Sequence, residues 1–154
     1  MSAWLDNRIP PPLVGLCCAL GMYVTAAASE HTELAFTPNY WLALPLLMIA
    51  LACMFLSIRE FARHRTTVNP LNPGSASKLV SSGIFAYSRN PMYLALLLIL
   101  ASLGLAWGSW LGVLWLLLCM LYLHCFQIYP EERAMLELFG ESYADYCRRV
   151  RRWC

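Results

Sequence analysis

The stretch MYLALLLILASLGLAWGSWLGVLWLLLCMLYLHCFQIY, residues 92–129, contains no Asp, Glu, Lys or Arg. As one straight helix it would be about 57 Å long, nearly twice the roughly 30 Å hydrocarbon core of a bilayer. A break is therefore needed, and Gly108-Ser109-Trp110 supplies turn-forming residues near the middle. The stretch predicts a hairpin of two membrane helices, over about 91–107 and 110–129.

Two further apolar runs precede this hairpin. The first follows three prolines and covers about residues 13–28, and the second covers about 40–58. Proline is tolerated at a helix start because its missing N–H would be unpaired there anyway. Of the 154 residues, 60% are hydrophobic and 13% charged, whereas a soluble domain has about a quarter charged residues. We therefore expect an all-α integral membrane protein, one domain over residues 1–154 with four transmembrane helices.

The basic residues predict the orientation in the membrane. All Lys and Arg lie before the first run, between residues 59 and 90, or after residue 129. Loops rich in Lys and Arg stay on the cytoplasmic side. Both termini, the loop 59–90 and the segment 131–153 are therefore expected in the cytoplasm. The net charge of +2 is too small to indicate nucleic-acid binding.

Polar residues gather at both ends of the hairpin. RNPMY, residues 89–93, precedes it, and QIYPEER, residues 127–133, closes it. Because a hairpin returns to the side from which it started, the two groups should meet at the membrane surface and form a ligand site. A guanidinium can donate two parallel hydrogen bonds to a carboxylate. The structural alternative is a set of interfacial anchors, with one glutamate favoured by the helix dipole.

The segments flanking the hairpin also carry patterns. The loop 66–83 is rich in Pro, Asn, Gly and Ser, and a connector of this length is often functional. The segment 131–153 spaces apolar residues by three and four, which predicts a cytoplasmic amphipathic helix. That helix would either lie on the membrane or cover the loop as a lid.

Metal and disulfide chemistry are not expected. The seven cysteines show no metal-ligand or disulfide spacing. Most lie in apolar runs, where a thiol behaves as a small hydrophobic group. His124, in the last apolar run, is expected to be a buried or interfacial histidine.

The order of these groups resembles the isoprenylcysteine carboxyl methyltransferases and the related phospholipid N-methyltransferases, which are integral membrane enzymes. The family signature L-V-x-S-G-x-[YF]-x-x-x-R-[HN]-P-x-Y corresponds to LVSSGIFAYSRNPMY at residues 79–93. An apolar hairpin follows, then two glutamates at 131–132 and FGESYADY at 139–146. The resemblance covers residues 66–152.

The resemblance implies that S-adenosylmethionine (SAM) binds in a cytoplasmic pocket under the amphipathic segment. By position, the cofactor-binding residues would be Leu79, Val80, Phe85, Asn90, Pro91, Tyr93 and Glu131. The candidate catalytic residues are Arg89, Gln127 and Glu132. Gln127 stands where enzymes acting on prenylcysteine carry an arginine for the acceptor, and an amide binds a carboxylate less strongly than a guanidinium does.

Three functions remain open from the sequence. The first is SAM-dependent methyl transfer to a lipophilic acceptor, preferably a carboxylate, which is ionised at pH 7 and needs no base. The second is N-methylation of a phospholipid amine, whose proton Glu132 would accept. The third is a small non-catalytic membrane protein whose polar groups only anchor its helices. Membrane lipids and a lipophilic acceptor are the expected partners, and the oligomeric state stays open.

Overall fold

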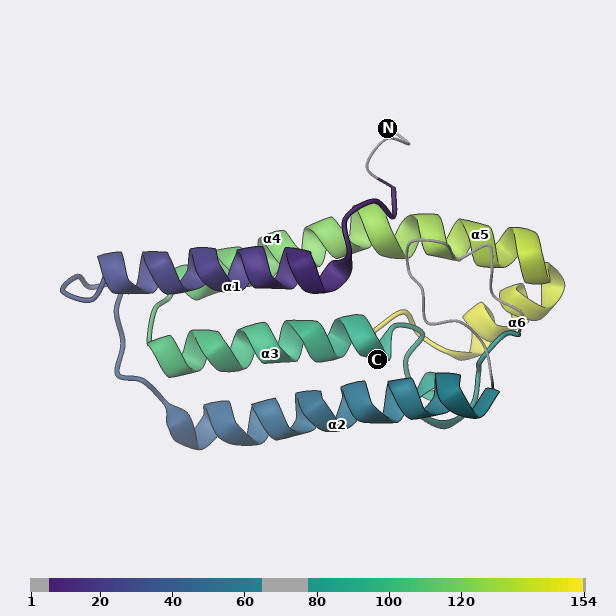
Figure 1. Ribbon diagram of the computed structural model, residues 1–154, viewed down its shortest axis with the longest axis horizontal. Helices are drawn as coiled ribbons and strands as arrows, with labels where there is room; N and C mark the ends of the chain where they lie inside the picture. The colour runs from purple at the N-terminus through teal and green to yellow at the C-terminus, as the bar shows by residue number, and fades with distance from the viewer. Residues whose placement is uncertain (1–5, 65–77, 154) are drawn as a thin grey trace.

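The computed structural model describes residues 6–64 and 78–153, and within these ranges the regular elements are helices (Figure 1). They are α1 (Pro11–Ala28), α2 (Tyr40–His64), a 3-10 turn (Gly83–Ala86), α3 (Pro91–Trp107), α4 (Leu111–Leu123), α5 (Tyr129–Phe139) and α6 (Glu141–Arg149). A π-helical turn, His124–Ile128, joins α4 to α5. Most of the predicted functional loop 66–83 lies outside the described residues.

Three helices are long and apolar enough to cross a membrane. They are Pro11–Ala28, Tyr40–His64 and the continuous helix Leu111–Phe139. The expectation of an all-helical membrane protein is thereby confirmed. α3 is also apolar but has only 17 residues, so the count of four spans stays a prediction.

The turn predicted at residues 108–110 is confirmed. Gly108 ends α3 in the left-handed conformation, with φ +67° and ψ 43°. A Cβ at this position would lie 2.3 Å from the carbonyl oxygen of Phe36, so a larger residue does not fit. The Phe36 N–H donates to the Gly108 carbonyl at 2.7 Å, which ties the loop after α1 to the turn.

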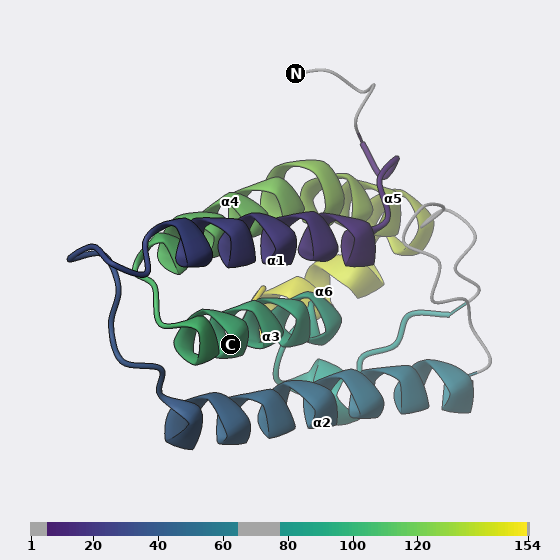
Figure 2. The same cartoon turned by 60° about the vertical axis from the view of Figure 1, so that its left-hand side comes forward.

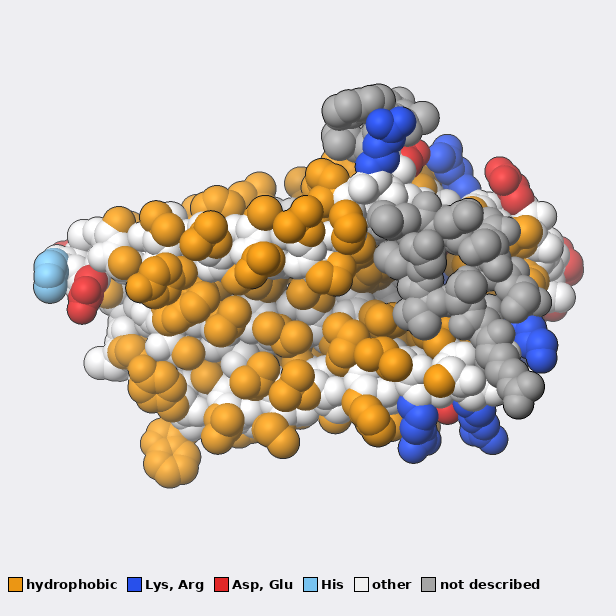
Figure 3. All heavy atoms as spheres, in the orientation of Figure 1, with side chains coloured by type: hydrophobic (Ala, Val, Ile, Leu, Met, Phe, Trp, Pro, Cys, Tyr) orange, Lys and Arg blue, Asp and Glu red, His pale blue; other side chains and the backbone are white. Residues whose placement is uncertain are grey.

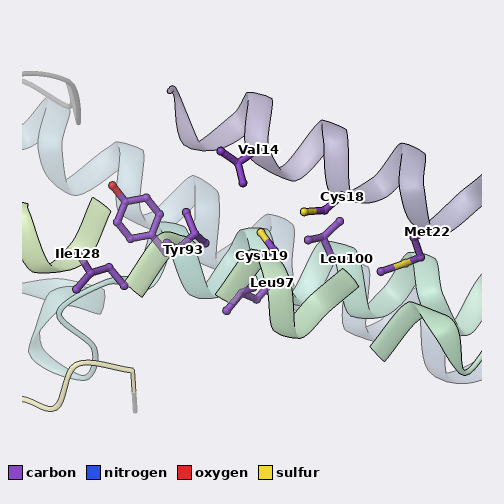
Figure 4. Close-up of a cluster of buried hydrophobic side chains, with 9 residues drawn as sticks. Val14, Cys18, Met22, Tyr93, Leu97, Leu100, Cys119 and Ile128 are labelled. Carbon is purple, nitrogen blue, oxygen red and sulfur yellow. The ribbon is translucent and has the colours of Figure 1, made fainter. Parts of the chain in front are cut away.

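α3 is the central helix of the bundle. Figures 1 and 2 show it between α2 on one side and α1 with α4 on the other, and it contacts all three. The main core forms where α1, α3 and α4 meet (Figure 4), and its buried members include Val14, Cys18, Met22, Leu97, Leu100, Cys119 and Leu123. Close van der Waals packing of these side chains holds the three helices together, because in lipid there is no hydrophobic driving force between apolar helices.

α2 packs on the outer side of α3. Ala43, Ala50 and Ser57 are buried along one face, and the Ser102 hydroxyl donates to the Ala43 carbonyl at 2.8 Å. The opposite face exposes large apolar side chains, among them Trp41 at 92% exposure. Figure 3 shows such side chains covering the length of the bundle. A continuous apolar exterior of this extent suits a lipid environment.

The segment 131–153 differs from the single amphipathic helix that its spacing predicted. Its first part, α5, continues from the last apolar helix without a break at Pro130. The break falls at Gly140, whose φ of +50° and ψ of −125° suit glycine. α6 then turns back, and the extended residues that follow reach the beginning of α3 (Figure 1).

Candidate functional site

A buried carboxylate at the end of α2 holds the segment that leads into α3. Glu60 is 3% exposed and accepts a hydrogen bond from the Ser82 hydroxyl at 2.9 Å. Gly83 has φ +59°, and a Cβ there would lie 2.6 Å from the Glu60 carboxyl carbon. The Phe85 ring, in the same turn, packs on Phe61 with centroids 5.2 Å apart. Glu60 therefore sets the path of the chain toward the site.

α3 begins with the expected proline. Asn90 precedes the helix, and Pro91 occupies its first turn, where no N–H is needed. Tyr93 follows and is only 8% exposed. Its ring lies at one end of the core cluster, and its hydroxyl points away from Leu97 and Leu100 (Figure 4). The helix thus carries a polar atom at the edge of the apolar core.

A π-helical turn lies in the helix Leu111–Phe139, directly before its two glutamates at 131–132. The Tyr129 N–H donates to the carbonyl of His124, five residues earlier. Pro130 has no N–H, so the Phe126 carbonyl lacks its usual helical partner. The Asn7 N–H donates to that carbonyl at 2.9 Å. The extra residue in the turn rotates the following side chains by about 100° around the helix axis.

Gln127 connects this turn to the segment before α1. Its side chain is 0% exposed, and its amide nitrogen donates to the Ile9 carbonyl at 2.8 Å. The nearby Arg133 guanidinium lies 3.2 Å from the Asp6 carboxylate. Gln127, which the sequence suggested as a contact for the methyl acceptor, therefore bonds to the protein's own backbone.

The two adjacent glutamates have different partners. Glu131 accepts a hydrogen bond from the Tyr93 hydroxyl. Glu132 lies 3.2 Å from the Arg89 guanidinium and receives two further hydrogen bonds from Arg152, at 3.0 and 2.5 Å. The hairpin thus brings its two polar ends together, and charge-assisted bidentate pairs of this kind are strong and geometrically specific.

Glu131 lies beyond the apolar part of its helix and has an unusual acidity. Burial raises the pKa of Glu131 to about 7, the hydrogen bond from Tyr93 lowers it in part, and the charge of Glu132 raises it. Near neutral pH the carboxyl therefore changes readily between its protonated and ionised forms. A cation placed beside it would favour the ionised form.

Residues after α6 complete the site. The Asn90 side-chain amide donates to the Arg152 carbonyl at 3.0 Å, and the Arg89 N–H donates to the Arg151 carbonyl at 3.0 Å. The Tyr146 hydroxyl of α6 donates to the Phe85 carbonyl at 2.7 Å. These contacts hold the 85–90 segment to α6 and to the residues after it, whereas Glu60 holds residues 82–83.

The predicted cofactor-binding residues lie around the beginning of α3, and most of them are buried. Val80, Phe85, Asn90, Pro91 and Tyr93 are buried, whereas Leu79 and Glu131 are half-buried. Leu79 packs against the small core of Tyr143, Tyr146 and Val150. Among the described residues, no group of three or more His, Cys, Asp or Glu has a metal-binding arrangement.

Sequence reasoning missed Glu60, Tyr146 and Arg152. Glu60 had a usable signal, because it is the only acidic residue in α2. Tyr146 stood within the family signature without an assigned role. Arg152 had no signal, since nothing in the run CRRVRRW distinguishes it from the neighbouring arginines.

Comparisons with known proteins cover much of the site. Residues 38–142 match the family model of phospholipid methyltransferases. An uncharacterized protein from Haemophilus influenzae is 46% identical over 66 residues, which are 40% of this chain and 98% of that relative. No solved structure matches the chain. Arg152 and the N-terminal contact residues Asn7 and Ile9 lie outside the matched range.

Proposed function

Because this chain belongs to the phospholipid methyltransferase family, we propose that it transfers a methyl group from SAM to a lipophilic acceptor at the membrane surface. The observation that carries the proposal is the meeting of the Tyr93–Glu131 and Arg89–Glu132 pairs at one end of the apolar helices. A polar, charged site in that position accepts a polar cofactor from the water and an apolar acceptor from the bilayer.

The residues present fit SAM. Glu131 is a half-buried carboxylate that accepts a hydrogen bond from the Tyr93 hydroxyl, and a carboxylate shielded from water is stabilised by a nearby cation. The sulfonium and the ammonium of SAM both meet that need. Asn90 offers an amide that both donates and accepts hydrogen bonds, and the half-buried Leu79 offers apolar surface to the adenosine, with Val80 and Phe85 buried beside it.

When bound, SAM supplies an electrophilic methyl group to a nucleophile that approaches in line with the S–CH3 bond. The protein's part is to hold the two reactants in that geometry, which is worth several kcal/mol of the barrier. The Tyr93–Glu131 hydrogen bond fixes the carboxylate on the cofactor side. The Arg89–Glu132 pair fixes the beginning of α3 against α5.

The contacts favour an amine over a carboxylate as the acceptor. The Gln127 amide bonds to the Ile9 carbonyl, and Arg89 and Arg152 both pair with Glu132. A carboxylate acceptor would have to share these guanidinium groups with Glu132.

The carboxylate acceptor is the second candidate, supported by the signature at residues 79–93. The two products differ chemically, because base hydrolyses a methyl ester to methanol and leaves an N-methyl group intact. We would incubate the detergent-purified protein with methyl-labelled SAM and either phosphatidylethanolamine or a farnesylated cysteine. The expected result is base-stable label in phosphatidylethanolamine. Volatile label released by base from the farnesylated cysteine would identify the carboxylate instead.

Two glutamate variants of α5 test whether SAM binding depends on the proposed site or on surface charge. Glu131→Gln should reduce SAM binding at least tenfold, because hydrogen bonds and ion pairs to a buried charged group are worth about 1.5–3 kcal/mol. Glu137→Gln, an exposed change in the same helix, should leave binding unchanged. Absence of SAM binding by the folded wild-type protein would support the non-catalytic alternative.

We place the site on the cytoplasmic side. Lys and Arg side chains gather at the end of the molecule where α5 and α6 lie (Figure 3). The loop between α1 and α2, at the opposite end, contains Glu30 and Glu33 but no Lys or Arg. The positive-inside rule then orients the bundle with its site toward the cytoplasm.

A further inference from the structure

Residues 150–153 lie across the proposed site, and we call them the strap. Val150 is buried against Tyr143 and Tyr146, and Trp153 packs against the main core. Between these two anchors, the Arg151 and Arg152 carbonyls accept the hydrogen bonds of Arg89 and Asn90 described above. The strap is therefore held on both sides of the residues that begin α3.

One side chain connects the strap to the glutamates. The Arg152 guanidinium donates to both oxygens of Glu132, at 3.0 and 2.5 Å, and lies 3.4 Å from the His124 ring. The pair is well shielded, since the side chain of Glu132 is 17% exposed and that of Arg152 is 29% exposed. A bidentate pair in such surroundings fixes direction as well as distance.

The family match ends at residue 142, in the first turn of α6 and before the strap. The glutamates, Arg89 and the beginning of α3 come from the matched range, whereas Arg152, the second guanidinium on Glu132, comes from outside it.

We propose that Arg152 is a positioning residue that latches the strap over the bound cofactor. The inference rests on the proposed function, because it requires SAM beside Asn90, Tyr93 and Glu131. Arg152 acts through other groups: its side chain holds Glu132, and its carbonyl holds the Asn90 amide. With the latch closed, the cofactor leaves only after the strap has lifted.

The latch predicts an effect on release more than on capture. Truncation of one partner of a shielded, hydrogen-bonded charge pair chiefly raises the dissociation rate. In Arg152→Ala the dissociation rate of SAM should rise about tenfold or more. Arg152→Lys keeps the charge without the planar fork and should give an intermediate rate. Arg149→Ala, which removes the same charge from exposed α6, should release SAM at the wild-type rate.

A second measurement reports on the strap without any cofactor. The Arg89 N–H donates to the Arg151 carbonyl, so its hydrogen exchange follows opening of the strap. Exchange of this amide in SAM-free protein should be faster in Arg152→Ala and Arg152→Lys than in wild type or Arg149→Ala. This comparison also shows whether each variant is folded, because amides inside α3 should keep their protection.

The outcomes separate the two proposals. Faster release together with faster Arg89 exchange, in Arg152 variants alone, supports the latch. Wild-type release rates in folded Arg152→Ala and Arg152→Lys overturn the latch and leave the proposed function standing. A folded wild-type protein that binds no SAM overturns the proposed function, and the latch with it.

Discussion

Glu131 and Glu132 are neighbours in sequence but do different work in the structure. Glu132 is held by two guanidinium groups, from Arg89 and Arg152. Glu131 has a tyrosine hydroxyl as its partner and a pKa raised to about 7 by burial. One carboxylate is therefore an anchor between segments, whereas the other keeps the capacity to meet a cation or to accept a proton.

The acidity of Glu131 predicts that SAM binding depends on pH. A cation binds the ionised carboxylate, so affinity should rise with pH through about 7 and then level off. The stability of the cofactor-free protein depends on pH in the opposite direction. The folded state holds this proton more tightly than the unfolded chain, so the stabilising contribution of protonated Glu131 is lost as pH rises from about 4.5 to about 7.

Tyr93→Phe tests the origin of that pH dependence. The hydrogen bond from Tyr93 lowers the pKa of Glu131, so its removal should move the midpoint of the binding profile to higher pH. Calorimetry of SAM binding between pH 5.5 and 9 measures the shift. Tyr129→Phe, at a position 56% exposed, is the matched control and should keep the wild-type midpoint. An unchanged midpoint in Tyr93→Phe would show that the ionisation of Glu131 does not control SAM binding.

At the scale of elements, the helix Leu111–Phe139 shows how one residue changes a register. Pro130 leaves the Phe126 carbonyl without a helical donor, and the Asn7 N–H supplies one at 2.9 Å. The π-helical turn that results sits directly before the glutamates. The segment before α1 therefore supports the position of the site, although it lies outside the part that matches the family.

Gln127→Leu tests whether this amide has a structural role. The change leaves the Ile9 carbonyl unpaired, so the free energy of unfolding should fall by about 1–3 kcal/mol. Denaturant titration in detergent measures that loss, and SAM affinity should change less than about threefold. A large fall in methyl transfer with unchanged stability would instead show that Gln127 contacts the methyl acceptor.

Gly140→Ala tests the joint between α5 and α6. A Cβ at Gly140 meets nothing within 4 Å, so the cost comes from its positive φ alone. The expected loss of stability is about 1–3 kcal/mol. Gly104→Ala is the control, because this glycine is helical and its Cβ would lie 3.5 Å from the Met22 sulfur. That change should be neutral or stabilising by up to about 1 kcal/mol.

At the scale of the whole molecule, apolar surface and charge divide the protein into a bundle and a polar end. The exposed faces of α1, α2 and α4 are rich in large apolar side chains. The polar end holds α5 and α6 (Figure 1), and Figure 3 shows charged side chains gathered there. The proposed site lies at the boundary, where both a lipid and a water-soluble cofactor have access.

The charge distribution predicts the topology. A reporter that is active only outside the cytoplasm should be active when inserted in the loop between α1 and α2, for example after His31. The same reporter should be inactive after Arg149. Reporter activity at both positions would mean an even number of crossings between residues 31 and 149, and would contradict the odd number that the four-span arrangement requires.

Sequence alone determined the features that depend on composition and local chain geometry. The uncharged run 92–129 required a hairpin, and Gly108 is the residue whose conformation allows the turn. A hairpin must return its ends to one side, so the proximity of residues 89–93 and 127–133 followed from length and hydrophobicity. The signature of the methyltransferase family followed from the same residues, and the family match confirmed it.

Tertiary structure decided which polar groups pair. The selection of Arg152 for Glu132, and of Asn7 for the Phe126 carbonyl, joins residues that are far apart or belong to different elements. No local pattern distinguishes Arg152 from the arginines beside it, because their charges are equal. The choice depends on where Gly140 turns α6 back and on which donor then meets a half-buried carboxylate. Charge and hydrophobicity are properties of the chain, whereas hydrogen-bond partners are fixed only when the helices have packed.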